Sequence, residues 1–93
     1  MSATVRIPTQ LRSLSGGAAE LTLEGGTLGA VFARLEEAHP GFRERLFDED
    51  GKLRRFVNVF VGDEDVRFLQ GLDTQVDDGQ TVSIVPAVAG GEA

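Results

Sequence analysis

The strongest candidate for chemistry in this sequence is a carboxyl group at a Gly-Gly pair, Gly90-Gly91, close to the end of the chain. Glycine has no Cβ atom and adopts positive φ angles readily. A segment that ends in two glycines can therefore enter a channel too narrow for branched side chains and present its carboxylate to another protein. Residues 81–85, just before it, alternate like a buried strand. The sequence predicts one domain over residues 1–86 and a flexible tail over residues 87–93.

The side chains predict little chemistry of their own. The chain has one histidine, His39, and no cysteine, so no thiol is present for a histidine to activate. We interpret His39 as a residue at a helix end. Residues 48–50 and 63–65 are acidic, and we interpret both runs as solvated turns rather than as a calcium loop. The glycine pairs at 16–17 and 25–26 fit no phosphate-binding motif. We predict no metal site and no catalytic residue.

The composition indicates how many domains the chain forms and which kinds of partner suit it. The 93 residues are enough for one core, and 41% of them are hydrophobic. Nine basic against fifteen acidic residues give a net charge of −6, which argues against nucleic acid as a partner and suits a positively charged protein surface. No signal segment and no long apolar run is evident, so we expect a cytoplasmic protein that does not bind a membrane.

The pattern along the chain predicts alternating strands and helices. Residues 3–7 and 20–24 read as strands that form a hairpin. Thr27 is a good N-cap for a helix that ends near His39, before Pro40. One apolar stripe follows from the helical spacing of Leu28, Val31, Phe32, Leu35 and Ala38.

The second half is predicted to be mostly strand. Residues 42–47 suggest a short helical turn, 55–61 the strongest strand, 64–69 a short edge strand and 81–85 the last strand. The economical packing is an α+β fold in which one main helix crosses one face of a mixed sheet, with the first and last strands parallel at its centre. This is the β-grasp, or ubiquitin-like, architecture.

Two phenylalanines in the strongest strand suggest a surface for a partner. Alternation places Val57, Val59 and Val61 on one face and Phe56 and Phe60 on the other. If the valines face the helix, the phenylalanines lie on the open face of the sheet, where an aromatic pair would form a docking patch. The alternative is that a loop or the tail covers them.

Several segments together resemble a known family. Residues 52–68 and 78–91, with shorter stretches at 5–9 and 27–31, resemble the MoaD/ThiS family of ubiquitin-like sulfur carriers, and most of all its CysO-type branch, which serves cysteine biosynthesis. The most specific parts are Arg-Phe-Val-Asn at 55–58, Asp-Glu-Asp-Val-Arg at 63–67 and Pro-Ala-Val-Ala-Gly-Gly at 86–91.

The resemblance implies a function for the tail. In this family an E1-like enzyme uses ATP and Mg to adenylate the terminal glycine carboxylate, and sulfide equivalents then displace AMP and leave a thiocarboxylate. Gly91 would thus be the site of covalent sulfur attachment, carried by Val88, Ala89 and Gly90. The protein itself would be no enzyme and would bind no cofactor. The implied sulfur acceptor is a PLP-dependent cysteine synthase that uses O-phosphoserine, or a thiazole-synthase-like enzyme.

The sequence departs from the family pattern at three places, and other functions stay open. Gln80 replaces an acidic residue, Ala87 replaces a second proline, and Glu92-Ala93 follow Gly91. The family implies removal of such an extension by a zinc-dependent JAMM-type peptidase; alternatively, the extension makes this copy inactive. A ubiquitin-like modifier conjugated through Gly91 to lysines, and a non-covalent β-grasp interaction module, are the alternative functions.

Overall fold

The computed structural model describes residues 2–86 of the chain. The strands are β1 (Ser2–Arg6), β2 (Glu20–Glu24), β3 (Gly26–Thr27), β4 (Val57–Val61), β5 (Glu64–Asp65), β6 (Gln75–Val76) and β7 (Thr81–Pro86). The helices are α1 (Leu28–Ala38) and α2 (Phe42–Leu46), with 3₁₀ turns η1 (Thr9–Leu11), η2 (Val66–Phe68) and η3 (Gly71–Asp73).

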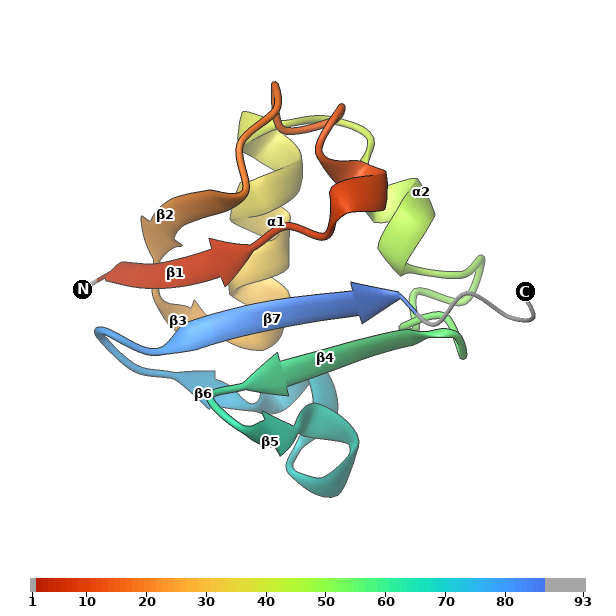
Figure 1. Cartoon of the computed structure of the whole chain (residues 1–93). Helices are drawn as coiled ribbons and strands as arrows, with labels where there is room; N and C mark the ends of the chain where they lie inside the picture. The colour runs from red at the N-terminus through yellow and green to blue at the C-terminus, as the bar shows by residue number, and fades with distance from the viewer. Residues whose placement is uncertain (1, 87–93) are drawn as a thin grey trace.

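The main sheet has the predicted mixed topology. Its order is β2-β1-β7-β4-β5, and β1 and β7 run parallel at its centre while the other pairs are antiparallel (Figure 1). The β1–β2 hairpin pairs Val5 with Leu21, as expected from the alternation of both segments. One main helix crosses one face, so the predicted β-grasp architecture is confirmed.

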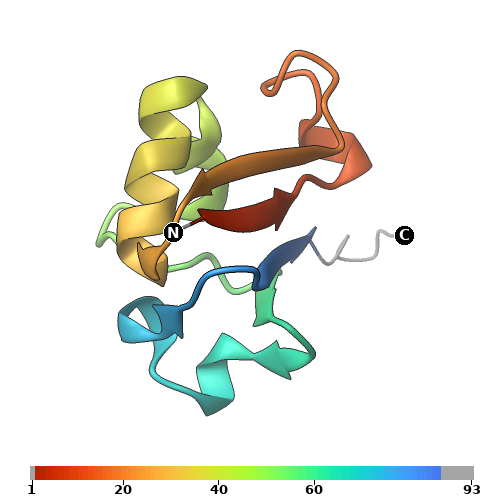
Figure 2. The ribbon, with the colours of Figure 1, turned by 90° about the vertical axis from the view of Figure 1, so that its left-hand side faces the viewer.

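Helix α1 is positioned by its cap and its apolar stripe. The Thr27 hydroxyl accepts a hydrogen bond from the Ala30 N–H at 3.2 Å. The side chains that α1 buries against the sheet are Leu28, Val31, Phe32 and Leu35. Ala38, predicted to extend this stripe, is exposed because it is the last residue of the helix, one turn beyond the buried Leu35. Both α1 and α2 lie on the same side of the sheet (Figure 2).

Two predicted strands are shorter than the pattern indicated. The strand expected at 55–61 begins at Val57, because the Val57 N–H donates to the Arg54 carbonyl and closes a turn just before it. The strand expected at 64–69 is only two residues long. Asp65 ends it by accepting the Arg67 N–H at 2.8 Å, which starts the 3₁₀ turn η2.

A second, two-stranded ladder lies at the start of α1. Strand β3 pairs with β6, and the Leu28 N–H donates to the Thr74 carbonyl at 2.8 Å. A Cβ on Gly25 would lie 2.8 Å from the Val76 carbonyl oxygen, which is too close for any side chain. Within residues 2–86, no helix combines the length and the apolar character needed to cross a membrane.

Candidate functional site

The carboxyl end of β7 is the part of the described structure closest in sequence to Gly91. Pro86, the last described residue, is the register partner of Val57 at the start of β4. The tail residues Val88, Ala89, Gly90 and Gly91 lie outside the described residues, so their roles stay predictions. Whatever its conformation, a five-residue segment spans at most about 18 Å. Any enzyme that acts on Gly91 must therefore dock close to this end of the sheet.

A shallow hollow lies beside the end of β7. It has a volume of about 330 Å³, and its apolar lining includes Leu11, Phe56 and Pro86. The charged side chains of Glu44, Arg45 and Arg54 line it as well. A lining that mixes apolar and charged side chains suits contact with another protein surface. Phe56 thus lies beside Pro86, where a partner that binds the tail would contact the domain.

Apolar side chains are exposed on the open face of the sheet and in the turn before β4. Phe56 is 48% exposed and Val85 is 45% exposed, whereas Phe60 is partly buried. Phe60 pairs with Ser83 and Val85 pairs with Asn58, so Phe60 and Val85 are diagonal neighbours on this face. We call Phe60 and Val85 the outer-face patch; Phe56 lies in the turn just before β4, at the edge of this face and beside the hollow. The prediction that both phenylalanines lie on the outer face of the sheet is correct for Phe60 and wrong for Phe56, because the chain is in a turn and not in a strand at Phe56. Their docking role stays a prediction.

Polar residues border the outer-face patch on the β1 side. Arg6 pairs with Ser83 in the parallel ladder and with Glu20 in the hairpin. The Arg6 Nε and Glu20 Oε2 atoms are 3.7 Å apart, and both side chains are more than half exposed. An ion pair this exposed contributes little to stability. Apolar side chains are also exposed away from this face, at Phe68 (86%) in η2 and at Leu69 (39%) just after it.

Sequence reasoning missed one residue at this end of the molecule, Arg67. Its guanidinium reaches from η2 to Asn58 and to the backbone of the loop that carries Phe56. Both segments lie in the stretch that resembles the sulfur carriers, but nothing in their spacing indicates contact. Only the placement of η2 along the edge of β4 brings them together.

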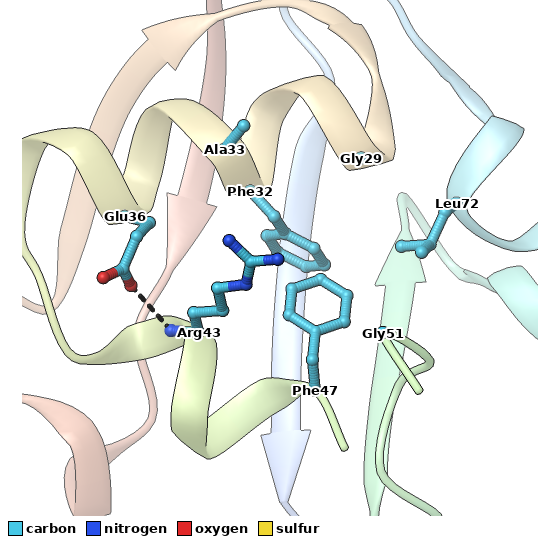
Figure 3. Close-up of a pocket in the computed structure, with 8 residues that line it drawn as sticks. All are labelled: Gly29, Phe32, Ala33, Glu36, Arg43, Phe47, Gly51 and Leu72. Carbon is cyan, nitrogen blue, oxygen red and sulfur yellow. Dashed lines mark hydrogen bonds between the residues drawn. The ribbon is translucent and has the colours of Figure 1, made fainter. Parts of the chain in front are cut away.

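A second hollow lies on the helix side of the molecule, away from the outer face (Figure 3). Its volume is about 310 Å³, and the rings of Phe32 and Phe47 meet edge to face in its wall, with centroids 5.8 Å apart. Glu36 accepts the Arg43 N–H at 2.7 Å and the Gly41 N–H at 3.2 Å. These two backbone hydrogen bonds, that from Arg43 first, lower the pKa of the Glu36 carboxyl below its usual range. The Glu36 carboxylate thus binds and stabilises the backbone at the start of α2.

The other polar residues singled out by sequence have structural roles. The His39 N–H donates to the Leu35 carbonyl at the end of α1, as expected for a helix-end residue. Asp48 accepts the N–H groups of Asp50 and Lys52 and closes the predicted turn. Among residues 2–86, no group of three or more histidine or acidic side chains could hold a metal ion.

Comparison with known sequences identifies the family. The sequence model of the ThiS family matches residues 5–91, from the middle of β1 through Gly91. This chain belongs to the ThiS family. The match includes both the described sheet and the Gly-Gly pair. The resemblance predicted from the segments at 52–68 and 78–91 is therefore confirmed.

Individual relatives agree with this membership. The sulfur carrier protein CysO of Mycobacterium tuberculosis is 54% identical over 93 residues, which covers 98% of this chain and all of the relative. The solved structure of a BexX/CysO complex from Amycolatopsis orientalis contains a chain that superposes with a TM-score of 0.89 at 48% identity, covering 95% of this chain and 98% of that one. The small archaeal modifier protein 3 of Haloferax volcanii is 41% identical over 68 residues, 73% of each chain.

Proposed function

We propose that this protein is a sulfur carrier that bears sulfur as a thiocarboxylate on Gly91. The observation that supports the proposal most strongly is the family match, which extends through residue 91. A relative named as a sulfur carrier is similar over its whole length. The described fold agrees with such a role, because central strand β7 ends at Pro86, only five residues before Gly91.

The chemistry takes place in two balanced steps on the carboxylate. Gly91 carboxylate attacks the α-phosphorus of ATP, held with Mg by an E1-like enzyme, and pyrophosphate leaves. In the resulting acyl adenylate the carboxylate oxygen has become part of a good leaving group. Hydrosulfide then attacks the acyl carbon, the bond to AMP breaks, a proton is released, and a thiocarboxylate remains. Glycine favours both steps because it leaves the reacting carbonyl uncrowded.

This chain supplies the docking surface and the tail, while the enzymes supply the catalytic groups. The outer-face patch and the hollow beside Pro86 lie within reach of the tail and expose apolar surface to a partner. The relative from Amycolatopsis orientalis was solved as a complex with BexX. That complex shows that a relative of this chain binds another protein. We propose that this chain docks to its E1-like activating enzyme through Phe56 and Phe60. Because activation needs ATP, we propose that the protein acts in the cytoplasm.

Processing must precede activation. Glu92 and Ala93 follow Gly91 in the sequence, so Gly91 has no free carboxylate until the bond after it is cleaved. We propose that a JAMM-type peptidase makes this cut. A chain that retains these two residues should be inert toward the activating enzyme and ATP, whereas a chain ending at Gly91 should form the adenylate.

The acceptor is proposed from the relatives. The similarity to CysO favours a PLP-dependent cysteine synthase, which exchanges the phosphate of O-phosphoserine for the carrier's sulfur. A thiazole-synthase-like enzyme is the other acceptor that a thiocarboxylate of this kind would serve. The two differ in product, so intact mass distinguishes them: only the synthase leaves an acyl-cysteine adduct on Gly91.

Intact mass spectrometry tests the proposal. The chain ending at Gly91 is incubated with the E1-like enzyme, ATP and sulfide, and it should gain the mass of one oxygen-to-sulfur exchange. Omission of ATP should abolish the gain, and Gly91→Ala should slow it. No ATP-dependent change with the cognate activating enzyme would overturn the sulfur-carrier proposal and leave the non-covalent interaction module.

A second candidate, a protein modifier, is favoured by one comparison. The similarity to a small archaeal modifier protein covers 73% of this chain. In that case activated Gly91 would form an amide with a lysine of a target protein. Lysine-linked conjugates in cell extract without any thiocarboxylate would favour this function over the carrier.

A further inference from the structure

Arg67 makes an unusual set of contacts for an exposed side chain. Its guanidinium donates four hydrogen bonds: from Nη1 to Asn58 Oδ1 at 2.6 Å, and from Nη2 to the carbonyl oxygens of Arg54 at 3.1 Å, Arg55 at 3.3 Å and Val57 at 2.8 Å. Bonds from a charged donor are stronger than those between neutral groups. One side chain thus binds four of the five residues from Arg54 to Asn58, where β4 begins.

The acceptors lie where the sheet has no neighbouring strand. Strand β5 pairs only with Phe60 and Val61, so in the described part of the chain the first residues of β4 have a strand on one side only. Backbone carbonyls at such an edge need another donor. The Arg67 guanidinium supplies a donor to the carbonyls of Arg55 and Val57, and it adds a second one to the Arg54 carbonyl, which also accepts the Val57 N–H. Its planar fork allows one group to reach several acceptors at once.

The Arg67 backbone is itself fixed. Asp65 Oδ1 accepts the Arg67 N–H at 2.8 Å, and the neighbouring Val66 is completely buried. The side chain therefore starts from an anchored turn and not from a loose loop. Its direction along the edge of β4 is determined by the fold.

The segment that Arg67 holds carries both parts of the candidate site. Val57, whose carbonyl it binds, is the register partner of Pro86 at the end of β7. Phe56 lies between two of the bound carbonyls, those of Arg55 and Val57. A shift of this segment would move the docking aromatic and the origin of the tail together.

We propose that Arg67 is a positioning residue that fixes the Phe56 loop relative to the tail-bearing end of β7. The inference rests on the proposed function, because it concerns how the tail and the docking surface meet one activating enzyme. A misplacement of about 1 Å between docked surfaces and reacting groups has large kinetic effects. Arg67 does not touch the reacting carboxylate and acts only through this geometry.

Kinetics of adenylation test the proposal. Chains ending at Gly91 are compared as wild type, Arg67→Ala, Arg67→Lys and the control Arg34→Ala, using ATP–pyrophosphate exchange with the E1-like enzyme well below every melting temperature. Arg34 is a matched control because its Nη1 also donates to two carbonyls, those of Glu24 and Gly25, at the opposite end of the sheet. We expect Arg67→Ala to raise the KM for the carrier roughly ten-fold with little change in kcat, and Arg34→Ala to leave both unchanged.

The lysine variant separates geometry from charge. Lysine keeps the positive charge but lacks the planar fork, so Arg67→Lys should resemble Arg67→Ala. If Arg67→Lys has wild-type kinetics, the rise in KM is due to the loss of charge and not of geometry. If Arg67→Ala has wild-type kinetics, Arg67 has no effect on KM. Either result overturns the proposal. A loss of melting temperature alone, without the KM change, would reduce Arg67 to a structural role and overturn it as well.

A measurement on the carrier alone separates this inference from the proposed function. In Arg67→Ala, NMR should show faster hydrogen exchange and shifted resonances at Val57, Asn58 and Val85, with α1 unchanged. If the wild-type chain is never adenylated, the sulfur-carrier proposal fails, and this NMR result alone decides whether Arg67 fixes the segment. Unchanged amides at these three positions would overturn the inference whatever the enzyme does.

Discussion

The two faces of strand β4 differ more than any other neighbouring parts of the molecule. Val57, Val59 and Val61 point toward α1 and are at most 6% exposed. Phe60, on the other face, is only partly buried, and its neighbour Val85 on that face is 45% exposed. The larger side chain of β4, Phe60, which would gain more from burial, is the one left in contact with water. Side chains on the helix-covered face stabilise the fold, and those on the outer face are available to a partner.

This separation has a use in a small carrier protein. A domain of this size has one core and little stability to lose. Alternation along a strand lets one segment serve the core and the surface without sharing residues. Substitutions on the two faces should therefore have different consequences, and the following variants test that difference in order of decreasing effect on stability.

Val59→Asp should have the largest effect. It places a charge without a partner among buried side chains, and we expect a loss of roughly 3–5 kcal/mol in the free energy of unfolding, measured in urea. A loss below about 1 kcal/mol would mean that the helix-covered face is not the core, and the comparison would fail.

Gly25→Ala should destabilise the fold without affecting the site. The new Cβ would lie 2.8 Å from the Val76 carbonyl oxygen, so the β3–β6 ladder must shift, at a cost of about 1–3 kcal/mol. In the control, Gly29→Ala, the Cβ meets only ordinary contacts at 3.5 Å, and stability should hold or rise. Adenylation of folded Gly25→Ala should be normal. A selective loss of adenylation would show that this distant ladder matters for docking.

Phe60→Asp should affect binding more than stability. Phe60 is partly buried on the outer face, where a carboxylate keeps contact with water, so a cost of about 1 kcal/mol is expected. Loss of an aromatic docking residue should weaken binding to the activating enzyme roughly 30-fold, measured by calorimetry. The control Thr22→Asp, on the same face in β2, adds the same charge. It should change neither the stability nor the binding to the activating enzyme. Equal weakening by both variants would assign the effect to charge and not to the outer-face patch.

Glu36→Gln should have the smallest effect, and one that depends on pH. The folded state lowers the pKa of this carboxyl, so its stabilising contribution is present above the pKa of the unfolded chain and is lost as pH falls through the lower folded value. The wild type should exceed Glu36→Gln in urea stability at neutral pH. The gap should narrow as pH falls below the pKa of the unfolded chain and close once pH is below the lowered folded value. A gap that stays constant with pH would show that the charged form has no special role.

The sequence predicted the architecture because each element has a strong local signal. The alternation of 57–61, the helical stripe from Leu28 to Leu35 and the Thr27 cap all follow from short-range patterns. The β3–β6 ladder was not predicted, because two paired residues far apart in the chain leave no periodicity to detect.

The candidate site was predicted in part. Alternation placed Phe60 on the outer face correctly but also placed Phe56 in the strand, where the structure has a turn. Gly91 was predicted by a motif together with a resemblance, and its role stays a prediction. Arg67 was missed, because its acceptors at 54–58 become neighbours only when η2 packs along the edge of β4. The start of β4 at Val57 was missed as well. A hydrogen bond from the Val57 N–H to the Arg54 carbonyl determines it, and side-chain alternation does not.

Cross-saturation NMR tests the central claim most directly. A deuterated, ¹⁵N-labelled chain ending at Gly91 is mixed with the protonated activating enzyme, and saturation of the enzyme's protons is transferred to the carrier amides that lie against it. The outer face and the tail-bearing end should respond, with the strongest losses at Phe56, Asn58, Phe60 and Val85, while α1 and the wall of the helix-side hollow at Phe47 and Leu72 should not. Transfer to α1, Phe47 and Leu72 with none to the outer-face patch would contradict the division of the molecule into a structural face and a docking face.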